Sequence, residues 1–123
     1  MTAESTAKPW PVELKLDPEK KKLTIAFDNG HAFTLAAEYL RVESPSAEVK
    51  GHAPGQRQII GGKRDVRITS LEPVGNYAVR ISFDDGHGTG LFTWDYLYDL
   101  GSDHNRIWDE YLRALRVKGL HRG

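Results

Sequence analysis

The chain has no cysteine, a single methionine and no net charge. Without thiols it cannot form disulfides, perform cysteine catalysis, hold an iron–sulfur cluster or build a cysteine-based zinc site. Seventeen basic side chains balance seventeen acidic ones, which disfavours a dedicated nucleic-acid binder, because such proteins are usually strongly basic. No apolar run approaches the roughly 18 residues of a membrane helix, and the start MTAESTAKPW lacks the pattern of a secretory signal. We therefore expect a cytoplasmic protein.

What remains is the composition of one globular domain. Hydrophobic residues make up 39% and charged residues 28% of the 123 residues. These proportions differ from those of disordered proteins, and a chain of this length can bury a core without a metal or disulfide. We assign residues 10–118 to a single domain and treat 1–9 and 119–123 as flexible tails.

Hydrophobic alternation predicts short strands along most of the chain. The expected strands are 12–16, 22–27, 31–35, 65–72, 77–83 and 90–94, with a short edge strand at 57–60 inside an irregular loop that spans 43–62. Residues 36–42 form a short helix or turn. Asp103 is a candidate N-cap for a helix through 108–117 that Gly119 ends. The predicted fold is α+β and mainly antiparallel β, with the C-terminal helix packed on a face of the sheet.

One hairpin motif occurs twice. FDNGH at 27–31 matches FDDGH at 83–87, and each copy leads to a Tyr-Leu pair, at 39–40 and 96–97. We interpret the repeat as architecture: two similar hairpin units form a sheet, and each Tyr-Leu pair closes the end of its own hairpin. The inward faces would carry Leu23, Ile25, Phe27, Val79, Ile81 and Phe83. The alternative is chemical, with His31 and His87 as ligands of a divalent metal beside Asp28, Asp84 and Asp85.

Three other patterns favour structural roles. The glycines of DGHGTG at 85–90 precede a strand instead of a helix, so they indicate a bulge or close backbone approach in place of a phosphate loop. A hydrolytic triad that uses Asp103, His104 and Asp109 is disfavoured, because the sequence contains no G-x-S-x-G nucleophile elbow. The C-terminal aromatic residues are either a recognition surface or, as we favour, mainly core: Trp94, Tyr96, Tyr98, Trp108 and Tyr111.

Basic residues concentrate in one region, namely Lys50, His52, Arg57, Lys63, Arg64 and Arg67. This region is a candidate contact for an acidic partner. The alternative is a solvated loop and edge strand, where such charges prevent sheet-to-sheet pairing. RNA is disfavoured because no aromatic residue interrupts the run to stack on bases.

Two longer stretches resemble a known family. LRVESPSAEV at 40–49 and LEPVGNYAVRISFDDGHGTGLFTWDYL at 71–97 are similar to the N-terminal domain of γ-butyrobetaine hydroxylase, over about 12–100. The resemblance implies a domain that, in eukaryotic relatives, precedes an iron- and 2-oxoglutarate-dependent oxygenase domain. The oxygenase chemistry belongs to that second domain, which this chain lacks. Similar domains are also fused to P-loop ATPase scaffold proteins of iron–sulfur cluster assembly.

The resemblance further implies a zinc site that this chain has lost. In the relatives three cysteines and one histidine hold zinc, and the cysteine positions correspond to Ser44, Ser46 and Val49, the histidine position to His87. Two hydroxyls and an aliphatic group replace three thiolates, and valine offers zinc no ligand. His87 is then a remnant of the hairpin motif or serves a new purpose.

The preferred function is a non-catalytic accessory module that binds another protein, in iron–sulfur cluster assembly or iron-enzyme biology. It would need no cofactor, no membrane and no nucleic acid, and its oligomeric state is left open. Candidate partner-binding residues are Arg57, Lys63, Arg64, Arg67, Asp84 and Asp85. The competing hypothesis is a small metal-binding protein or metal-dependent enzyme that uses His31 and His87.

Overall fold

The computed structural model describes residues 9–51 and 57–123. Within these ranges the strands form two three-stranded antiparallel sheets, in the orders β1-β2-β3 and β4-β5-β6, where one sheet was predicted. The first contains β1 (Pro11–Leu16), β2 (Lys22–Phe27) and β3 (Ala32–Ala36), and the second β4 (Ile68–Val74), β5 (Ala78–Phe83) and β6 (Gly90–Thr93). The α+β, mainly β class is confirmed.

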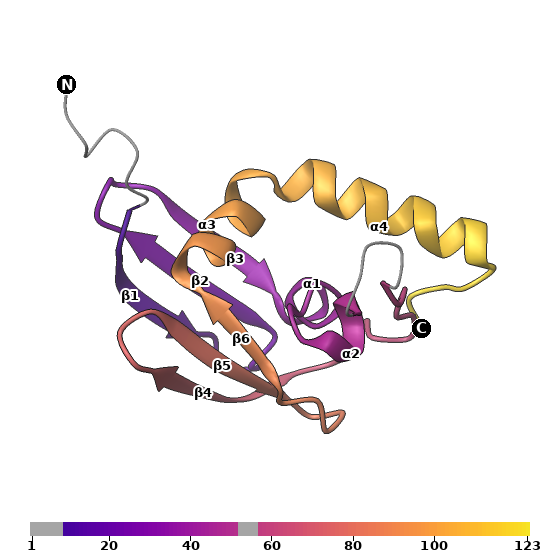
Figure 1. The fold of residues 1–123 in the computed structure, drawn as a ribbon, viewed down its shortest axis with the longest axis horizontal. Coiled ribbons are helices and arrows are strands. Elements are labelled where there is room, and N and C mark those ends of the chain that lie inside the picture. The colour runs from indigo at the N-terminus through magenta and orange to yellow at the C-terminus, as the bar shows by residue number, and fades with distance from the viewer. Residues whose placement is uncertain (1–8, 52–56) are drawn as a thin grey trace.

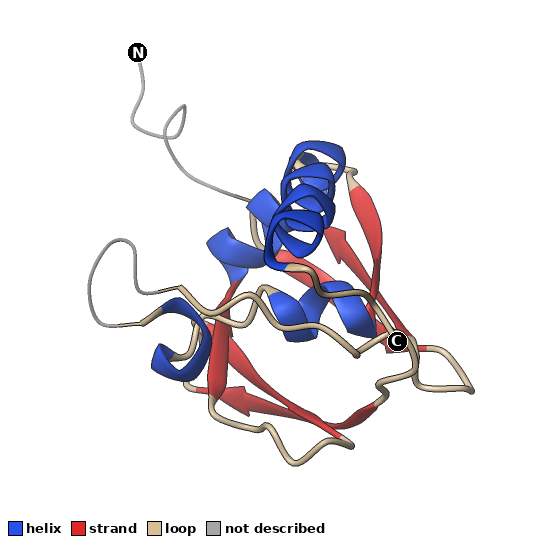
Figure 2. Cartoon of the chain, turned by 90° about the vertical axis from the view of Figure 1, so that its right-hand side faces the viewer, coloured by secondary structure: helices blue, strands red, loops and turns tan. Residues whose placement is uncertain are grey.

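The described helices gather at one end of the two sheets (Figures 1 and 2). They are α1 (Ala37–Val42), α2 (Ala47–Lys50), α3 (Trp94–Ser102) and α4 (His104–Lys118). The predicted C-terminal helix exists and ends at Gly119, whose φ of 71° suits a glycine. Asp103 occupies the predicted N-cap position, but its side chain makes no capping bond and pairs with Arg106. No described helix combines the length and apolar character needed to cross a membrane.

The two hairpin units match in backbone detail. In each turn the Phe27 or Phe83 amide donates to the carbonyl of the following histidine, at 2.8 Å in both copies. The Asp28 carboxylate accepts from the Trp10 amide at 3.1 Å, and the Asp84 carboxylate accepts from the Arg67 amide at 3.1 Å. Trp10 and Arg67 therefore occupy equivalent positions. The architectural interpretation of the repeat is supported at the level of individual hydrogen bonds.

A shared core joins the two sheets. All six residues predicted to face inward are buried, at 3% exposure or less: Leu23, Ile25, Phe27, Val79, Ile81 and Phe83. Val12, in the first strand, is 65% exposed. The predicted edge strand at 57–60 is wrong. Its isoleucines pack against Tyr111 and its neighbours, and the Tyr111 hydroxyl donates to the Ile60 carbonyl in place of a strand partner.

Hydrogen bonds from two tyrosine hydroxyls connect α1 with α3. The Tyr39 hydroxyl, from α1, donates to the Leu100 carbonyl of α3 at 2.7 Å. The Tyr96 hydroxyl, from α3, donates to the Glu43 carbonyl that follows α1 at 2.5 Å. Burial, the largest influence, raises the pKa of both phenols far above the ordinary value. Each tyrosine hydroxyl therefore bonds to the helical segment of the other hairpin unit, while Leu40 and Leu97 lie in the shared core.

Residues 119–123, expected to form a tail, fold back onto the domain. The Arg122 guanidinium donates two hydrogen bonds to the Glu38 carboxylate, at 2.9 and 2.8 Å, and Glu38 is 5% exposed. The carbonyls of His121 and Arg122 accept from the amides of Gly62 and Arg64. These contacts hold the segment at 62–64 beside the end of the chain.

Removing either crossing hydroxyl should destabilise the whole domain. We expect Tyr39→Phe and Tyr96→Phe each to lower the free energy of unfolding by about 1–2 kcal/mol, because a buried carbonyl is left unpaired. Urea denaturation followed by circular dichroism measures this. Tyr77→Phe is the control, since Tyr77 is 51% exposed. Equal stability of all three variants would contradict the role of the crossing bonds.

Candidate functional site

The repeated histidines lie in different surroundings. His87 is 8% exposed and its ring lies beside Phe83. His31 is exposed and its ring lies near Phe33 and Tyr98. None of the described side chains that contact one ring contacts the other.

The chain between α1 and α2 carries Ser44 and Ser46 to the His87 ring. Ser44 follows the end of α1, and Ser46 immediately precedes α2. Gly90 permits this approach, because a Cβ at that position would lie 2.4 Å from Oγ of Ser44. The predicted close backbone approach of the glycine-rich stretch is therefore confirmed at Gly90.

Polar side chains lie beside both nitrogens of the His87 ring. Oγ of Ser44 lies 2.9 Å and Oγ of Ser46 lies 3.4 Å from Nε2, within hydrogen-bonding distance. Oε1 of Glu48 lies 3.1 Å from Nδ1 and accepts a hydrogen bond from the Thr89 hydroxyl at 2.9 Å. Burial and then the positive charge of Arg41 lower the His87 pKa, so the ring is neutral at pH 7.

The four positions that hold zinc in the relatives do meet in space. Ser44 and Ser46 contact His87, and Val49 lines the same cavity as His87, of about 380 Å³. This set does not fit zinc, which binds thiolate, imidazole or carboxylate. The described residues contain no group of three or more histidine or acidic side chains placed to hold a metal. The nearby Arg41 Nη1 is buried without a partner among the described residues, and a cationic donor repels metal ions.

The Ser44–His87–Glu48 chain resembles the relay of a serine hydrolase, yet it cannot act as one. Ser44 is 0% exposed, so no substrate carbonyl can reach its hydroxyl. The residue lies between two short helices, whereas a nucleophile elbow lies between a strand and a helix. Ser44 instead hydrogen-bonds to the ring, and Glu48, whose side chain is 65% exposed, lies beside the other ring nitrogen. We call this set the His87 cluster: Ser44, Ser46, Glu48 and His87.

A charged group beside the His87 cluster fixes the hairpin turn. Oδ2 of Asp85 lies 2.7 Å from Nε of Arg41 and 2.7 Å from Nζ of Lys63, and Oδ1 accepts from the His87 amide. Burial opposes ionisation of Asp85, but the hydrogen bonds from Lys63, His87 and Arg41 outweigh it and lower its pKa to about 2. Asp85 and Lys63 thus have structural partners.

The other predicted partner-binding residues divide into paired and outward-facing ones. Arg57 donates to the buried Glu43 carboxylate at 2.7 Å. Arg64, Arg67 and Asp84 are exposed, and the side chains of the two arginines form no ion pair with another described residue. His52, part of the predicted basic region, lies outside the described residues.

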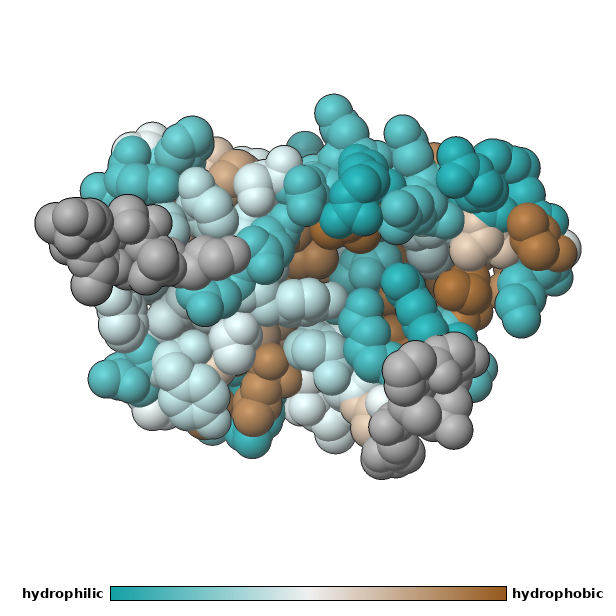
Figure 3. Space-filling model, turned by 45° about the horizontal axis from the view of Figure 1, so that its top comes forward, coloured by the Kyte–Doolittle hydropathy of each residue, from teal (hydrophilic) through white to brown (hydrophobic). Residues whose placement is uncertain are grey.

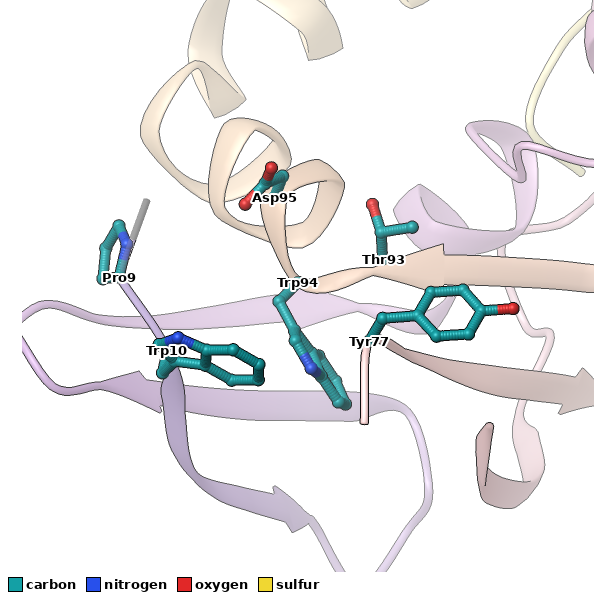
Figure 4. Close-up of a pocket in the computed structure, with 6 residues that line it drawn as sticks. All are labelled: Pro9, Trp10, Tyr77, Thr93, Trp94 and Asp95. Carbon is teal, nitrogen blue, oxygen red and sulfur yellow. The ribbon is translucent and has the colours of Figure 1, made fainter. Parts of the chain in front are cut away.

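Sequence reasoning missed an aromatic cleft of about 330 Å³ on another face (Figure 4). Trp10 and Tyr77 are 54% and 51% exposed, and Trp94, expected mainly in the core, is only partly buried. The cleft is lined by Pro9, Trp10, Tyr77, Thr93, Trp94 and Asp95. These residues come from three separate segments, so no single pattern in the sequence could have indicated the cleft.

Restoring three thiolates should restore metal binding. We expect Ser44→Cys, Ser46→Cys and Val49→Cys together to bind zinc at one ion per chain, because the backbone already brings these positions to His87. Metal analysis after dialysis measures the zinc content. The controls are the wild-type chain and the triple variant with the added change His87→Ala. We expect the wild-type chain to retain no zinc, and the His87→Ala control to retain less zinc than the triple variant. A folded triple variant without zinc would contradict the geometry.

Neutralising Asp85 should destabilise the fold in a pH-dependent way. We expect Asp85→Asn to cost about 2 kcal/mol near pH 7, because it leaves Arg41 buried without its counter-ion. A carboxylate with a lowered pKa stabilises the fold above its unfolded value of 3.8. The difference between wild type and variant should therefore shrink as the pH falls from 3.8 towards 2.

Urea unfolding at several pH values measures this difference. Asp109→Asn, at an exposed position of α4, is the matched control and should change stability little. A difference between wild type and Asp85→Asn that stays constant down to pH 2 would refute the assignment.

Comparisons with known proteins agree with this fold. Residues 14–98 match the family described as "Gamma-butyrobetaine hydroxylase-like, N-terminal". No curated protein matches the chain. Two structures determined by NMR in solution are similar, with a TM-score of 0.81 each. The first is 43% identical in sequence, and the match covers 94% of this chain and 91% of that chain. The second is 48% identical, and the match covers 99% of this chain and 90% of that chain.

A crystal structure from Acidithiobacillus ferrooxidans ATCC 23270 is also similar. It is described as a protein of unknown function in the DUF971 family, with a TM-score of 0.64 and 38% identity, and the match covers 76% of this chain and 97% of that chain. The family match spans more than half of this chain and includes both hairpin units and the His87 cluster. The chain therefore belongs to the family of γ-butyrobetaine hydroxylase-like N-terminal domains.

Proposed function

We propose that this chain is a non-catalytic accessory module that binds another protein in the cytoplasm. The observation that supports this most is the His87 cluster. The four positions that the resemblance equates with metal ligands converge, but two are serines bonded to His87 and one is a valine, and the Ser44 hydroxyl is buried. We therefore propose that the domain acts by binding other molecules at its surface.

One surface suited to a partner lies beside the end of the chain. Arg64 and Asp84 border a shallow cavity of about 270 Å³ with Gly62, Asp65 and Gly123. Arg67 is exposed next to them in the chain, and its backbone amide is fixed by Asp84. The side chains of Arg64 and Arg67 form no ion pair with another described residue, so an acidic side chain of a partner can pair with them. The face that carries α4 offers only separated apolar patches between hydrophilic residues (Figure 3).

The family resemblance suggests where to search for the partner. Related domains occur beside iron–sulfur assembly scaffolds and iron-dependent oxygenases, so we propose a partner from iron–sulfur assembly or iron-enzyme biology. This assignment of the partner is separate from the assignment of a binding role, and the two can fail separately.

Charge reversal on this surface tests the binding role. Tagged wild-type chain is incubated with native extract and the captured proteins are identified by mass spectrometry. We expect a specific partner whose capture falls at least tenfold for Arg64→Glu with Arg67→Glu, because opposite charges become like charges. Arg113→Glu with Arg116→Glu, at exposed positions of α4, is the charge-matched control and should capture normally. Equal loss in both double variants, or no specific partner, would contradict the proposal.

A further inference from the structure

The aromatic cleft contains two half-exposed rings that the architecture does not explain, those of Trp10 and Tyr77. Trp94 also packs against the core, and its indole N–H donates to the Asn76 carbonyl at 2.9 Å. Trp10 and Trp94 lie side by side, Tyr77 lies beyond Trp94, and Asp95 lies above the rings on α3 (Figure 4). Large aromatic rings at half exposure are unfavourable in water unless a ligand covers them. The cleft therefore needs an explanation beyond folding.

Equivalent positions in the two hairpin units can be compared to see whether the fold needs these aromatic rings. The Trp94 amide donates to the Tyr77 carbonyl, and in the other unit the Ala37 amide donates to the Lys21 carbonyl. Alanine and lysine thus occupy the positions equivalent to Trp94 and Tyr77, just as Arg67 occupies the position equivalent to Trp10. One unit folds with Ala37 buried and Lys21 paired with Asp65. The second unit folds with Arg67 at the position equivalent to Trp10. The fold therefore does not require the half-exposed rings of Trp10 and Tyr77.

The charges around the cleft select a cationic occupant. The described lining residues include no lysine, arginine or histidine, and their one charged side chain is the exposed carboxylate of Asp95. A second carboxylate, Asp28, accepts from the Trp10 amide. The faces of tryptophan and tyrosine rings are electron-rich and attract cations. Ring faces and carboxylates together complement a positive charge and repel a negative one.

We propose that the aromatic cleft binds an arginine side chain presented by a segment of a partner protein. A planar guanidinium can stack on an indole and pair with a carboxylate at the same time, which an ammonium group cannot do as well. In this arrangement the guanidinium lies against Trp10 and Trp94 and donates to Asp95. The inference rests on the proposed binding role and names a second contact, remote in sequence from Arg64 and Arg67.

A peptide titration followed by NMR tests this inference. The full ¹⁵N-labelled chain is titrated with Ac-Gly-Gly-Arg-Gly-Gly-amide, with the glutamine peptide of the same design as the neutral match. We expect the arginine peptide to shift the indole N–H signals of Trp10 and Trp94 with saturation in the millimolar range, and the glutamine peptide to shift neither. Raising the salt from 50 to 500 mM should weaken binding several-fold, because the contact is partly ionic.

Variants then identify the groups responsible. We expect Trp10→Ala to weaken binding about tenfold and Asp95→Asn about threefold, in line with the strength of cation–aromatic and ionic contacts. Asp109→Asn on α4 is the carboxylate-matched control and should bind as wild type does. Asp95→Asn keeps the inference testable if Trp10→Ala fails to fold, which circular dichroism reports.

Several outcomes would overturn the inference. Equal binding of the arginine and glutamine peptides, stronger binding of a proline peptide, or an unchanged affinity in Asp95→Asn would each show that the cleft does not select a guanidinium. A partner captured through Arg64 and Arg67 while the peptide fails to bind would refute this inference and leave the proposed function intact.

Discussion

The exchange of tyrosine hydroxyl bonds between the two hairpin units is the interaction on which the rest of the structure depends. A three-stranded sheet with one helical turn is too small to bury a core alone. Tyr39 and Tyr96 each satisfy a carbonyl at the helix end of the other unit, where backbone groups would otherwise lack partners. Because the Tyr96 bond ends on Glu43, it also fixes the residue before Ser44, so the same exchange positions the His87 cluster.

The sequence alone predicted the features that depend on residues close together in the chain. Strand alternation and the Asn-Gly and Asp-Gly turns predicted the hairpins and the inward faces, because both signals lie within a few residues of one another. It did not reveal that two sheets form, nor that the tyrosines cross, because periodicity reports a buried face and not its partner. The contact between Glu48 and His87 joins distant segments that share no pattern. Residues 57–60 were predicted as an edge strand, but their isoleucines pack against the cluster of Tyr111 instead.

The two hairpin units share the same turn hydrogen bonds, but the side chains around equivalent positions differ. Both turns carry the same backbone hydrogen bonds, yet one histidine is exposed and the other is enclosed by Ser44, Ser46 and Glu48. Likewise Ala37 is buried where the equivalent Trp94 borders an open cleft. A duplicated scaffold thus supplies stability twice, and its copies differ in the surroundings of the histidine and at the aromatic cleft.

The central claim is that the two units form one cooperative body. Native-state hydrogen exchange tests it directly, since each amide reports the free energy of the opening that exposes it. The account predicts that the amides of the two central strands, β2 and β5, exchange through the same global opening, with equal free energies and equal dependence on urea. A lower free energy for one of the two strands would show that its unit opens by itself and would contradict the account.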